Sequence, residues 1–235
     1  MDTPDYRSEP VSFARRGGRL TDRQQRAWDA LSDSHILDIP RRDTSTSVDP
    51  NYRFDPAATF GRTAPLIVEI GSGRGEAVVE AAAAYPDTDF LALEVYIPGI
   101  AQTLVWMQNR RVDNVRIALL NAAEALETTL EPGSVDELWV FFPDPWPKLR
   151  HHKRRLVTPD FAAKAARVLK PGGVWRLATD WQNYADGMRK VLQDSPDFEF
   201  DGTWAPRFEG RLFTRFENKG LAVDREIRDL KAIRI

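Results

Sequence analysis

The stretch LIVEIGSGRGEAVVEAAAAY (66–85) decides the fold of this chain. Its first part, LIVEI (66–70), is a short apolar run of the kind found in buried strands, and glycines follow at every second position of the next five residues. The segment EAVVEAAAAY (76–85) then has the composition of a helix. A strand, a glycine turn and a helix in this order predict one unit of an α/β fold.

The same alternation continues along the rest of the chain. Apolar runs that predict further strands lie at 90–94, 115–120, 136–142 and 174–179. Helical patterns between them lie at 100–111, 123–127 and 159–169. Thr158 and Pro159 suit the N-cap and first turn of the last of these helices. Because the strands are apolar throughout, we expect a mostly parallel sheet with helices on both faces, and ligands beyond the carboxyl ends of its strands.

The beginning of the chain has a different character. Residues 1–60 mix Pro, Asp, Ser, Thr and Arg without sustained periodicity, apart from a short amphipathic segment near 23–31. We therefore expect an arginine-rich, partly flexible arm over 1–60 and one α/β domain over 61–235. The tail that begins near residue 198 leaves room for additional strands in that domain.

The composition argues against several classes of protein. With 235 residues, 42% of them hydrophobic, the chain can bury one large core. It has no cysteine, and its three histidines lack zinc-ligand spacing, so we expect neither disulfides nor a metal site. No apolar run approaches the roughly 18 residues of a membrane helix, and the first residues do not form a secretory signal. We expect a cytoplasmic protein.

The net charge of −2 conceals local concentrations of positive charge. Residues 148–155 include five Lys or Arg, two His and no acid, while residues 7–26 include six arginines against two acids. Both segments are positive patches on a nearly neutral body, and such patches can attract phosphate groups.

The glycine loop indicates which cofactor the domain binds. The loop contains Gly71, Gly73 and Gly75. Glycines there allow a tight turn and a close approach of the backbone to a ligand, but a dinucleotide fingerprint would place its last glycine where Glu76 stands. Glu94, at the end of the second strand, can accept hydrogen bonds from a ribose. Glu69 lies inside an apolar strand, where a carboxylate needs a positive or hydrogen-bonding partner. S-adenosylmethionine offers the ribose, an ammonium and a sulfonium, whereas NAD has no free ammonium.

The fourth strand runs into an unusual segment, PDPWPKLRHHKRR (143–155). Prolines on either side of Asp144 fix the backbone and remove N–H donors, so this carboxylate is held in one direction. It can accept hydrogen bonds from the N–H groups on the Watson–Crick edge of guanine, and Trp146 offers a face for stacking. The cations behind them are suited to phosphates: Lys148, Arg150, Lys153, Arg154 and Arg155.

The pattern E-x-G-x-G-x-G at 69–75 resembles the first motif of the class I S-adenosylmethionine-dependent methyltransferases. The resemblance implies a Rossmann-like, seven-stranded, mostly parallel sheet with an antiparallel last strand. It also implies that Glu69 and the glycines contact the methionine half of S-adenosyl-L-methionine, and that Glu94 contacts the ribose. Asn121 stands where an acid often meets the adenine amino group, and its amide carbonyl can accept the same hydrogen bond.

The chain as a whole resembles the bacterial tRNA (guanine-N(7)-)-methyltransferase family (TrmB). The resemblance is carried by RRGGRLTDRQQRAW (15–28), EIGSGRGE (69–76), FFPDPWPKLRHHKRR (141–155), ATD (178–180) and TRFENKG (214–220). It implies an enzyme that methylates nitrogen 7 of a guanosine in the variable loop of tRNA, with Asp144 at the active centre beside the cofactor.

The same resemblance assigns two further sets of residues. The implied contacts to the substrate nucleoside or RNA are Lys148, Asp180, Thr214, Arg215, Phe216 and Glu217. The implied RNA-contacting stretch is Arg150, His151, His152, Lys153, Arg154 and Arg155.

The implied reaction fits these residues chemically. Nitrogen 7 of guanine carries a free lone pair, so it can attack a sulfonium methyl group without first losing a proton. The site must align the reacting atoms and place acids near a base that becomes cationic. Asp144, Asp180 and Glu217 are the candidates for that role.

Two alternatives remain open at this point. One is a nicotinamide-dependent Rossmann oxidoreductase, and the other is a non-catalytic RNA-binding protein that uses only its basic segments. Cofactor binding distinguishes them, because the first should bind NAD and the second should bind neither cofactor. The sequence does not indicate whether the protein is a monomer or a homodimer.

Overall fold

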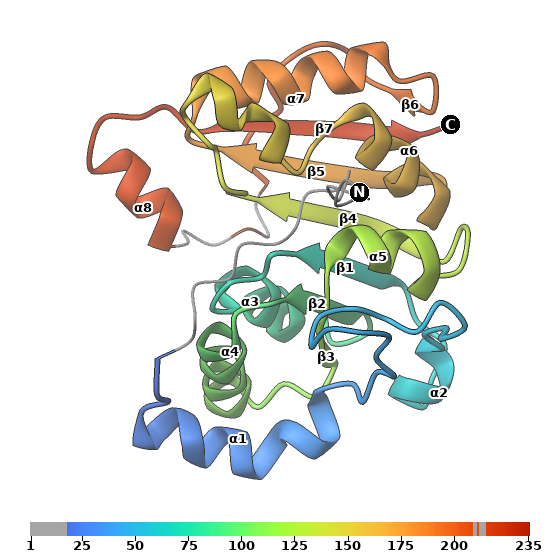
Figure 1. Ribbon diagram of the computed structural model, residues 1–235, viewed down its shortest axis with the longest axis vertical. Helices are drawn as coiled ribbons and strands as arrows, with labels where there is room; N and C mark the ends of the chain where they lie inside the picture. Colours follow the sequence, from blue (N-terminus) through green and yellow to red (C-terminus); the bar gives the residue numbers. More distant parts are fainter. Residues whose placement is uncertain (1–17, 209–210, 212–214) are drawn as a thin grey trace, which may run out of the picture.

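The computed structural model describes residues 18–208, 211 and 215–235. Its strands form one sheet in the order β3-β2-β1-β4-β5-β7-β6 (Figure 1). The strands are β1 (Leu66–Ile70), β2 (Asp89–Glu94), β3 (Val115–Leu119), β4 (Val135–Phe141), β5 (Leu169–Thr179), β6 (Phe198–Glu199) and β7 (Arg228–Arg234).

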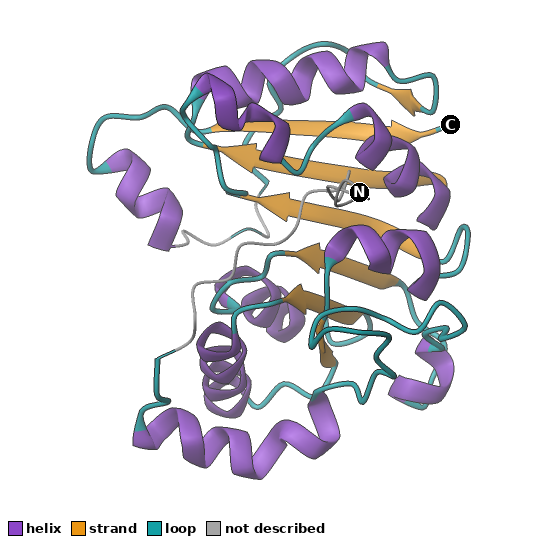
Figure 2. Cartoon of the chain, viewed as in Figure 1, coloured by secondary structure: helices purple, strands orange, loops and turns teal. Residues whose placement is uncertain are grey.

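Helices connect most of these strands (Figure 2). The α-helices are α1 (Asp22–His35), α2 (Pro56–Phe60), α3 (Glu76–Ala84), α4 (Ile97–Arg110), α5 (Ala122–Glu124), α6 (Pro159–Val168), α7 (Gln182–Asp194) and α8 (Arg215–Leu221). A π-helical turn, η1 (Ala125–Thr129), extends α5, and a 3-10 helix, η2 (Leu149–Arg154), follows β4.

The direction of the strands confirms the predicted fold class. Strands β1 to β5 are all parallel, and β7 runs antiparallel to both of its neighbours, β5 and β6. The order of the parallel strands reverses between β1 and β4. In open α/β sheets, a ligand crevice forms at such a reversal, beyond the carboxyl ends of the strands.

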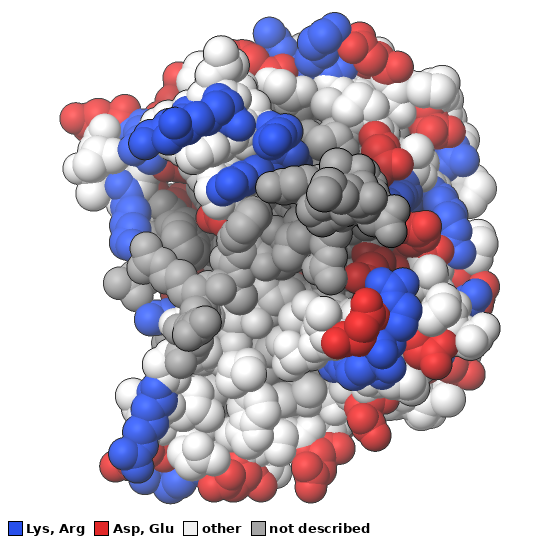
Figure 3. All heavy atoms as spheres, viewed as in Figure 1, with Lys and Arg blue, Asp and Glu red and all other residues white. Residues whose placement is uncertain are grey.

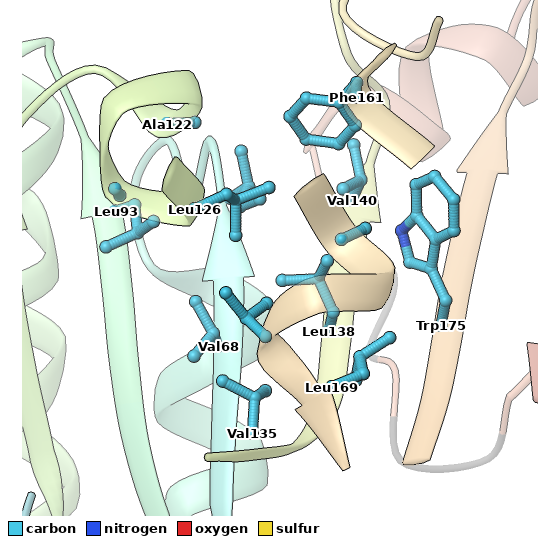
Figure 4. Close-up of a cluster of buried hydrophobic side chains, with 14 of the residues drawn as sticks. Val68, Leu93, Ala122, Leu126, Val135, Leu138, Val140, Phe161, Leu169 and Trp175 are labelled. Carbon is cyan, nitrogen blue, oxygen red and sulfur yellow. The ribbon is translucent and has the colours of Figure 1, made fainter. Parts of the chain in front are cut away.

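Side chains that alternate along the strands build a core on each face of the sheet. Leu138 and Val140 of β4 face the layer that contains α5, α6 and α7, whereas Trp139 faces the layer that contains α1, α3 and α4. Figure 4 shows Leu138 and Val140 on the first face, with Phe161 of α6 close to Trp175 of β5. Burial on both faces explains why these strands read as continuous apolar runs.

Local signals predict both ends of α6 correctly. The side chain of Thr158 accepts a hydrogen bond from the backbone of Phe161, and Pro159 occupies the first turn. The helix ends at Val168, one residue before its predicted end. The chain then enters β5 at Leu169, five residues before the predicted strand, and a register shift after the pair of Leu169 with Val135 accommodates the extra residues.

The segment before β1 is more closely packed than we expected. Ile39, Val48 and Phe54 are buried in the same core as the sheet. Helix α1 packs along α4, and Gln24 donates a hydrogen bond to the carbonyl of Pro98 at 3.2 Å. This part of the expected arm is therefore joined to the α/β body by apolar burial, and residues 1–17 lie outside the described residues.

Within residues 18–208, 211 and 215–235, no helix combines the length and apolar character needed to span a membrane.

A buried leucine of β4 should contribute strongly to stability. Leu138 has no exposed side-chain surface, so Leu138→Ala leaves a cavity and should lower the free energy of unfolding by about 2–5 kcal/mol. Leu149 is 82% exposed, and Leu149→Ala should change it by no more than about 0.5 kcal/mol. Urea unfolding of both variants measures the difference, and equal losses would contradict the assignment of the core.

Candidate active site

The glycine loop between β1 and α3 adopts a backbone that favours glycine. Gly71, Gly73 and Gly75 have φ angles of 71°, 59° and 76°, in the left-handed region. The backbone N–H of Gly71 donates to the carbonyl of Leu93 at 2.8 Å, which ties the loop to the end of β2. The loop therefore lies at the predicted crevice between β1 and its neighbours.

Helix α4 presses directly against this loop. A Cβ atom at Gly99 would lie 2.2 Å from the carbonyl oxygen of Gly73, and a Cβ at Gly75 would lie 2.4 Å from Cγ2 of Thr103. Side chains at these two glycines would push the loop and the helix apart. Sequence reasoning missed the role of Gly99 and Thr103, for which a glycine in the first turn of a helix was the one available signal.

Glu94 fixes the shape of the crevice. Its carboxylate accepts hydrogen bonds from the backbone N–H groups of Gly73 at 2.6 Å, Val95 at 2.7 Å and Tyr96 at 2.9 Å. Burial raises the pKa of Glu94, and these hydrogen bonds oppose the rise. The predicted ribose acceptor is thus also the residue that joins the glycine loop to the start of α4.

Glu69 is a buried acid with an unused oxygen. Its Oε2 atom has no hydrogen-bond partner in the described part of the chain, and the same is true of the hydroxyl of neighbouring Ser72. Burial raises the pKa of Glu69 to about 8, and the nearby acids Glu94 and Glu76 add to the rise. A cationic ligand with an N–H donor would satisfy this position chemically.

Asn121 lies at the end of β3, where the sequence predicted an adenine contact. Its side-chain oxygen accepts a hydrogen bond from the backbone of Ala123 at 2.9 Å, so it caps α5. The cap orients the amide while its N–H₂ group and second lone pair keep their bonding capacity.

The loop after β4 is strained at both ends. Phe142 and Trp146, on either side of Pro143-Asp144-Pro145, have φ angles of 51° and 43°, which large side chains adopt rarely. Phe142 is held there because its backbone N–H donates to the carbonyl of Ala178 at 2.8 Å. Strain of this kind, of order 1–3 kcal/mol for each residue, clusters at functional sites.

Asp144 is exposed and lies near Glu94. Its negative charge adds to the effect of burial in raising the pKa of Glu94, and it does the same for Tyr184, whose pKa is raised to about 12. The predicted catalytic carboxylate therefore lies within electrostatic reach of the predicted ribose acceptor.

The basic run divides into outward and inward residues. Lys148, Arg150 and Lys153 are exposed. On the face of the molecule in Figure 3, Lys and Arg side chains gather at the upper left. Arg154 stacks its guanidinium 5.0 Å from the ring centroid of Trp146, and the ring of His151 meets the same indole edge-on. The half-buried His152 also belongs to this run.

Arg155 does not point outward with the other cations. It is 8% exposed and donates hydrogen bonds to the carbonyl of Pro145 and the side chain of Asn183. Because its side chain is buried, Arg155 is not accessible for the predicted contact with RNA in this conformation.

Asp180 directly follows β5, and Asp144 lies in the loop after the neighbouring strand β4, whose last residue, Phe141, pairs with Ala178. Arg225 donates to Oδ2 of Asp180 at 2.7 Å. A Cβ at Gly220 of α8 would lie 2.8 Å from the Cβ of Asp180, so the glycine lets α8 approach this acid.

The side chain of Glu217, in α8, points into a buried cluster of charged groups. It is 1% exposed and accepts hydrogen bonds from Arg207 and Arg211, and Arg211 also pairs with Asp229 of β7. Its predicted contact with substrate is thus not open in this conformation. Thr214 lies outside the described residues, and only the backbone of Arg215 and Phe216, in α8, is described.

Four predicted site residues lie at or just beyond the carboxyl ends of β1, β2, β4 and β5: Glu69, Glu94, Asp144 and Asp180. Of these, Glu94 acts electrostatically on Glu69, and Asp144 on Glu94. Among the described residues, no group of His, Cys, Asp or Glu is arranged to hold a metal ion. The arrangement can hold a cationic ligand in the glycine loop and a hydrogen-bond-donating ring against the acids of β4 and β5.

The raised pKa of Glu69 should make stability depend on pH. Between pH 4.5 and about 8 the folded protein keeps a proton that the unfolded chain releases, so the stability contributed by this group falls as pH rises. The side chain in Glu69→Gln is neutral at every pH. The free energy of unfolding of this variant should therefore rise relative to that of the wild type by ~1.4 kcal/mol for each pH unit within that range.

Urea unfolding of the ligand-free wild type and Glu69→Gln from pH 5 to 9 measures this difference. Parallel stability curves for the two proteins would show that Glu69 is ionised in the folded state at neutral pH.

Known proteins similar to this chain point to one activity. Residues 63–230 match a family model described as "Putative methyltransferase". A tRNA (guanine-N(7)-)-methyltransferase of Arthrobacter sp. (strain FB24) is 47% identical over 96% of this chain and 86% of that protein. The enzyme of the same name from Cutibacterium acnes is 49% identical over 94% of this chain and 81% of that protein.

Solved structures of lower sequence identity share the fold. The 16S rRNA methyltransferase KamB superposes with a TM-score of 0.56 at 17% identity, over 83% of this chain and 99% of that one. TrmN from Thermus thermophilus superposes with a TM-score of 0.51 at 16% identity, over 77% of this chain and 47% of that one. Together with the sequence relatives, the match over residues 63–230 shows that this chain belongs to the tRNA (guanine-N(7)-)-methyltransferase family.

Proposed function

We propose that the protein transfers a methyl group from S-adenosyl-L-methionine to nitrogen 7 of a guanosine in the variable loop of tRNA. The observation that carries the proposal is the position of Asp144, which a strained loop holds exposed and within electrostatic reach of Glu94 at the glycine loop. The loop that we assign to the methyl donor and the carboxylate that we assign to the acceptor therefore lie at the same edge of the sheet, within a proposed methyltransferase domain over 61–235.

The donor side of the crevice fits S-adenosyl-L-methionine. Glu69 offers a buried oxygen that has no hydrogen-bond partner among the described residues, which suits the ammonium of the methionine half. The left-handed φ angles of the glycine loop permit close approach of a ligand. We assign the ribose to Glu94, at the end of β2, and the adenine to Asn121, just after β3. The bound cofactor supplies a methyl group activated by its attachment to a positive sulfur.

The acceptor side fits a guanine base. The carboxylate of Asp144 can accept hydrogen bonds from the N–H groups on the Watson–Crick edge, which leaves nitrogen 7 on the opposite side of the ring system. No proton has to leave nitrogen 7 before it attacks. The negative charges of Asp144 and Asp180 stabilise the positive charge that develops on the base, and this stabilisation is largest in the transition state.

The outward cations fit the phosphates of a folded RNA. Lys148, Arg150 and Lys153 are exposed beside the loop that carries Asp144, so phosphate contacts there would set the register of the RNA over the crevice. Trp146, braced by Arg154 and His151, completes the surface with an aromatic ring suited to stacking on a base.

The two alternatives have less support. A nicotinamide cofactor does not account for the buried oxygen of Glu69, which lacks a partner in the described part of the chain. In addition, Glu76 stands where a dinucleotide fingerprint has its last glycine. A protein that only binds RNA would not need a buried acid under a glycine loop. Family membership favours methyl transfer over both.

Removing the charge of Asp144 should slow methyl transfer more than it weakens RNA binding. Asp144→Asn keeps the shape of the side chain but loses a charge that stabilises the cationic base in the transition state. We expect a fall in the single-turnover rate on the order of 10²-fold, with tRNA affinity nearly unchanged because phosphate contacts dominate it. The assay uses unmodified tRNA, labelled S-adenosyl-L-methionine and analysis of the digested nucleosides.

In the same assay, the wild type should place its label in 7-methylguanosine, and exposed Asp87→Asn should behave like it. A transcript that contains 7-deazaguanosine presents C–H in place of nitrogen 7 and should bind without being labelled. Label in a different nucleoside would overturn the proposed function, and a normal rate for Asp144→Asn would assign that carboxylate a structural role.

A further inference from the structure

Arg155 differs from every other cation of the basic run in where its charge lies. It is 8% exposed, although Lys153, two positions earlier, is exposed. A buried guanidinium is stable only when hydrogen bonds satisfy it. The partners of the Arg155 guanidinium therefore indicate its structural role.

Those contacts join the loop after β4 to the first turn of α7. The Nε–H of Arg155 donates to the carbonyl of Pro145 at 3.0 Å, and Nη2 donates to Oδ1 of Asn183 at 2.9 Å. The guanidinium carbon lies 4.8 Å from the ring centroid of Tyr184. Nη2 also lies 3.1 Å from Nε2 of His152.

The carbonyl of Pro145 belongs to the peptide that enters the strained end of the loop. The next residue, Trp146, has a φ of 43°, so this peptide has an orientation that large residues rarely adopt. The flanking Pro143 and Pro145 have no N–H groups with which to anchor the loop. A donor from outside the loop is needed, and Arg155 supplies it next to Asp144.

The support behind Arg155 is itself rigid. Tyr184 is 1% exposed, and its hydroxyl accepts a hydrogen bond from the backbone N–H of Val157 at 3.1 Å. The aromatic face on which the guanidinium rests is therefore tied to the segment that immediately follows Arg155. The planar guanidinium can donate and stack at once, which a lysine ammonium cannot do in the same way.

We propose that Arg155 is a positioning residue, which holds the Pro145 carbonyl and thereby the direction of the Asp144 carboxylate, and that it does not act as a phosphate contact. The inference rests on the proposed function, because the position of Asp144 matters for a base bound beside it. The basic run then has two tasks: the exposed cations bind RNA, and its last member shapes the active site.

The substitution Arg155→Lys separates the two roles because it keeps the charge. It removes the Nε–H bond to Pro145 and the planar stack on Tyr184, so we expect the single-turnover rate at saturating tRNA and donor to fall about 10- to 100-fold. The slope of log affinity for tRNA against log salt should stay at the wild-type value. Lys153→Ala, as the outward comparison, should reduce that slope by roughly 0.7–0.9. A wild-type rate for Arg155→Lys would overturn the inference.

Two further variants provide an independent test and a control. Asn183→Ala removes one partner of Arg155 and no charge, so it should lower the same rate by a smaller factor without altering the salt slope. It tests the inference even if Arg155→Lys fails to fold, and an unchanged rate would contradict it. Lys190→Ala, an exposed substitution farther along α7, should leave both quantities unchanged.

Hydrogen exchange tests the positioning role without relying on methyl transfer. Backbone amides of residues 141–148 should exchange faster in Asn183→Ala, and in Arg155→Lys, than in the wild type. If the wild type forms no 7-methylguanosine, the proposed function fails while the exchange result still decides the positioning role. Unchanged exchange in that segment would overturn it.

Discussion

The carboxylate of Glu94 is the group on which the rest of the crevice depends. By accepting three backbone N–H groups, from Gly73, Val95 and Tyr96, it joins the glycine loop to the start of α4. Helix α4 can then approach so closely that Gly99 touches the carbonyl of Gly73. A loop built from glycine has little stiffness of its own, so this buried acid and the adjoining helix give the pocket a defined shape.

The site combines features that reduce stability. In the part of the chain that the structure describes, Glu69 and Ser72 have buried polar atoms without hydrogen-bond partners, as do Thr129, Trp175 and Arg211 elsewhere in the fold. Phe142 and Trp146 have strained backbones on the other side of the crevice. Such features persist where a ligand or a reacting group gains from them. The donor half is thus shaped by backbone and buried acids, and the acceptor half by a stiff loop.

Sequence reasoning predicted the parts of this architecture that depend on local patterns. The strand, glycine turn and helix at 66–85 followed from composition and spacing, and the cap at Thr158 followed from short-range chemistry. It could not predict which way Arg155 turns, because that depends on partners brought near by folding. For the same reason it did not foresee the buried pairing of Glu217 with two arginines.

When the ammonium of S-adenosyl-L-methionine binds beside Glu69, the carboxyl group of this residue should lose its proton. Titration calorimetry of S-adenosyl-L-methionine binding at pH 7, in two buffers that differ in ionisation enthalpy, counts the protons released on binding. Because the pKa of Glu69 is raised to about 8, we predict a release approaching about one proton, which Glu69→Gln should abolish. Binding without proton release in the wild type, or equal release in both proteins, would contradict this account.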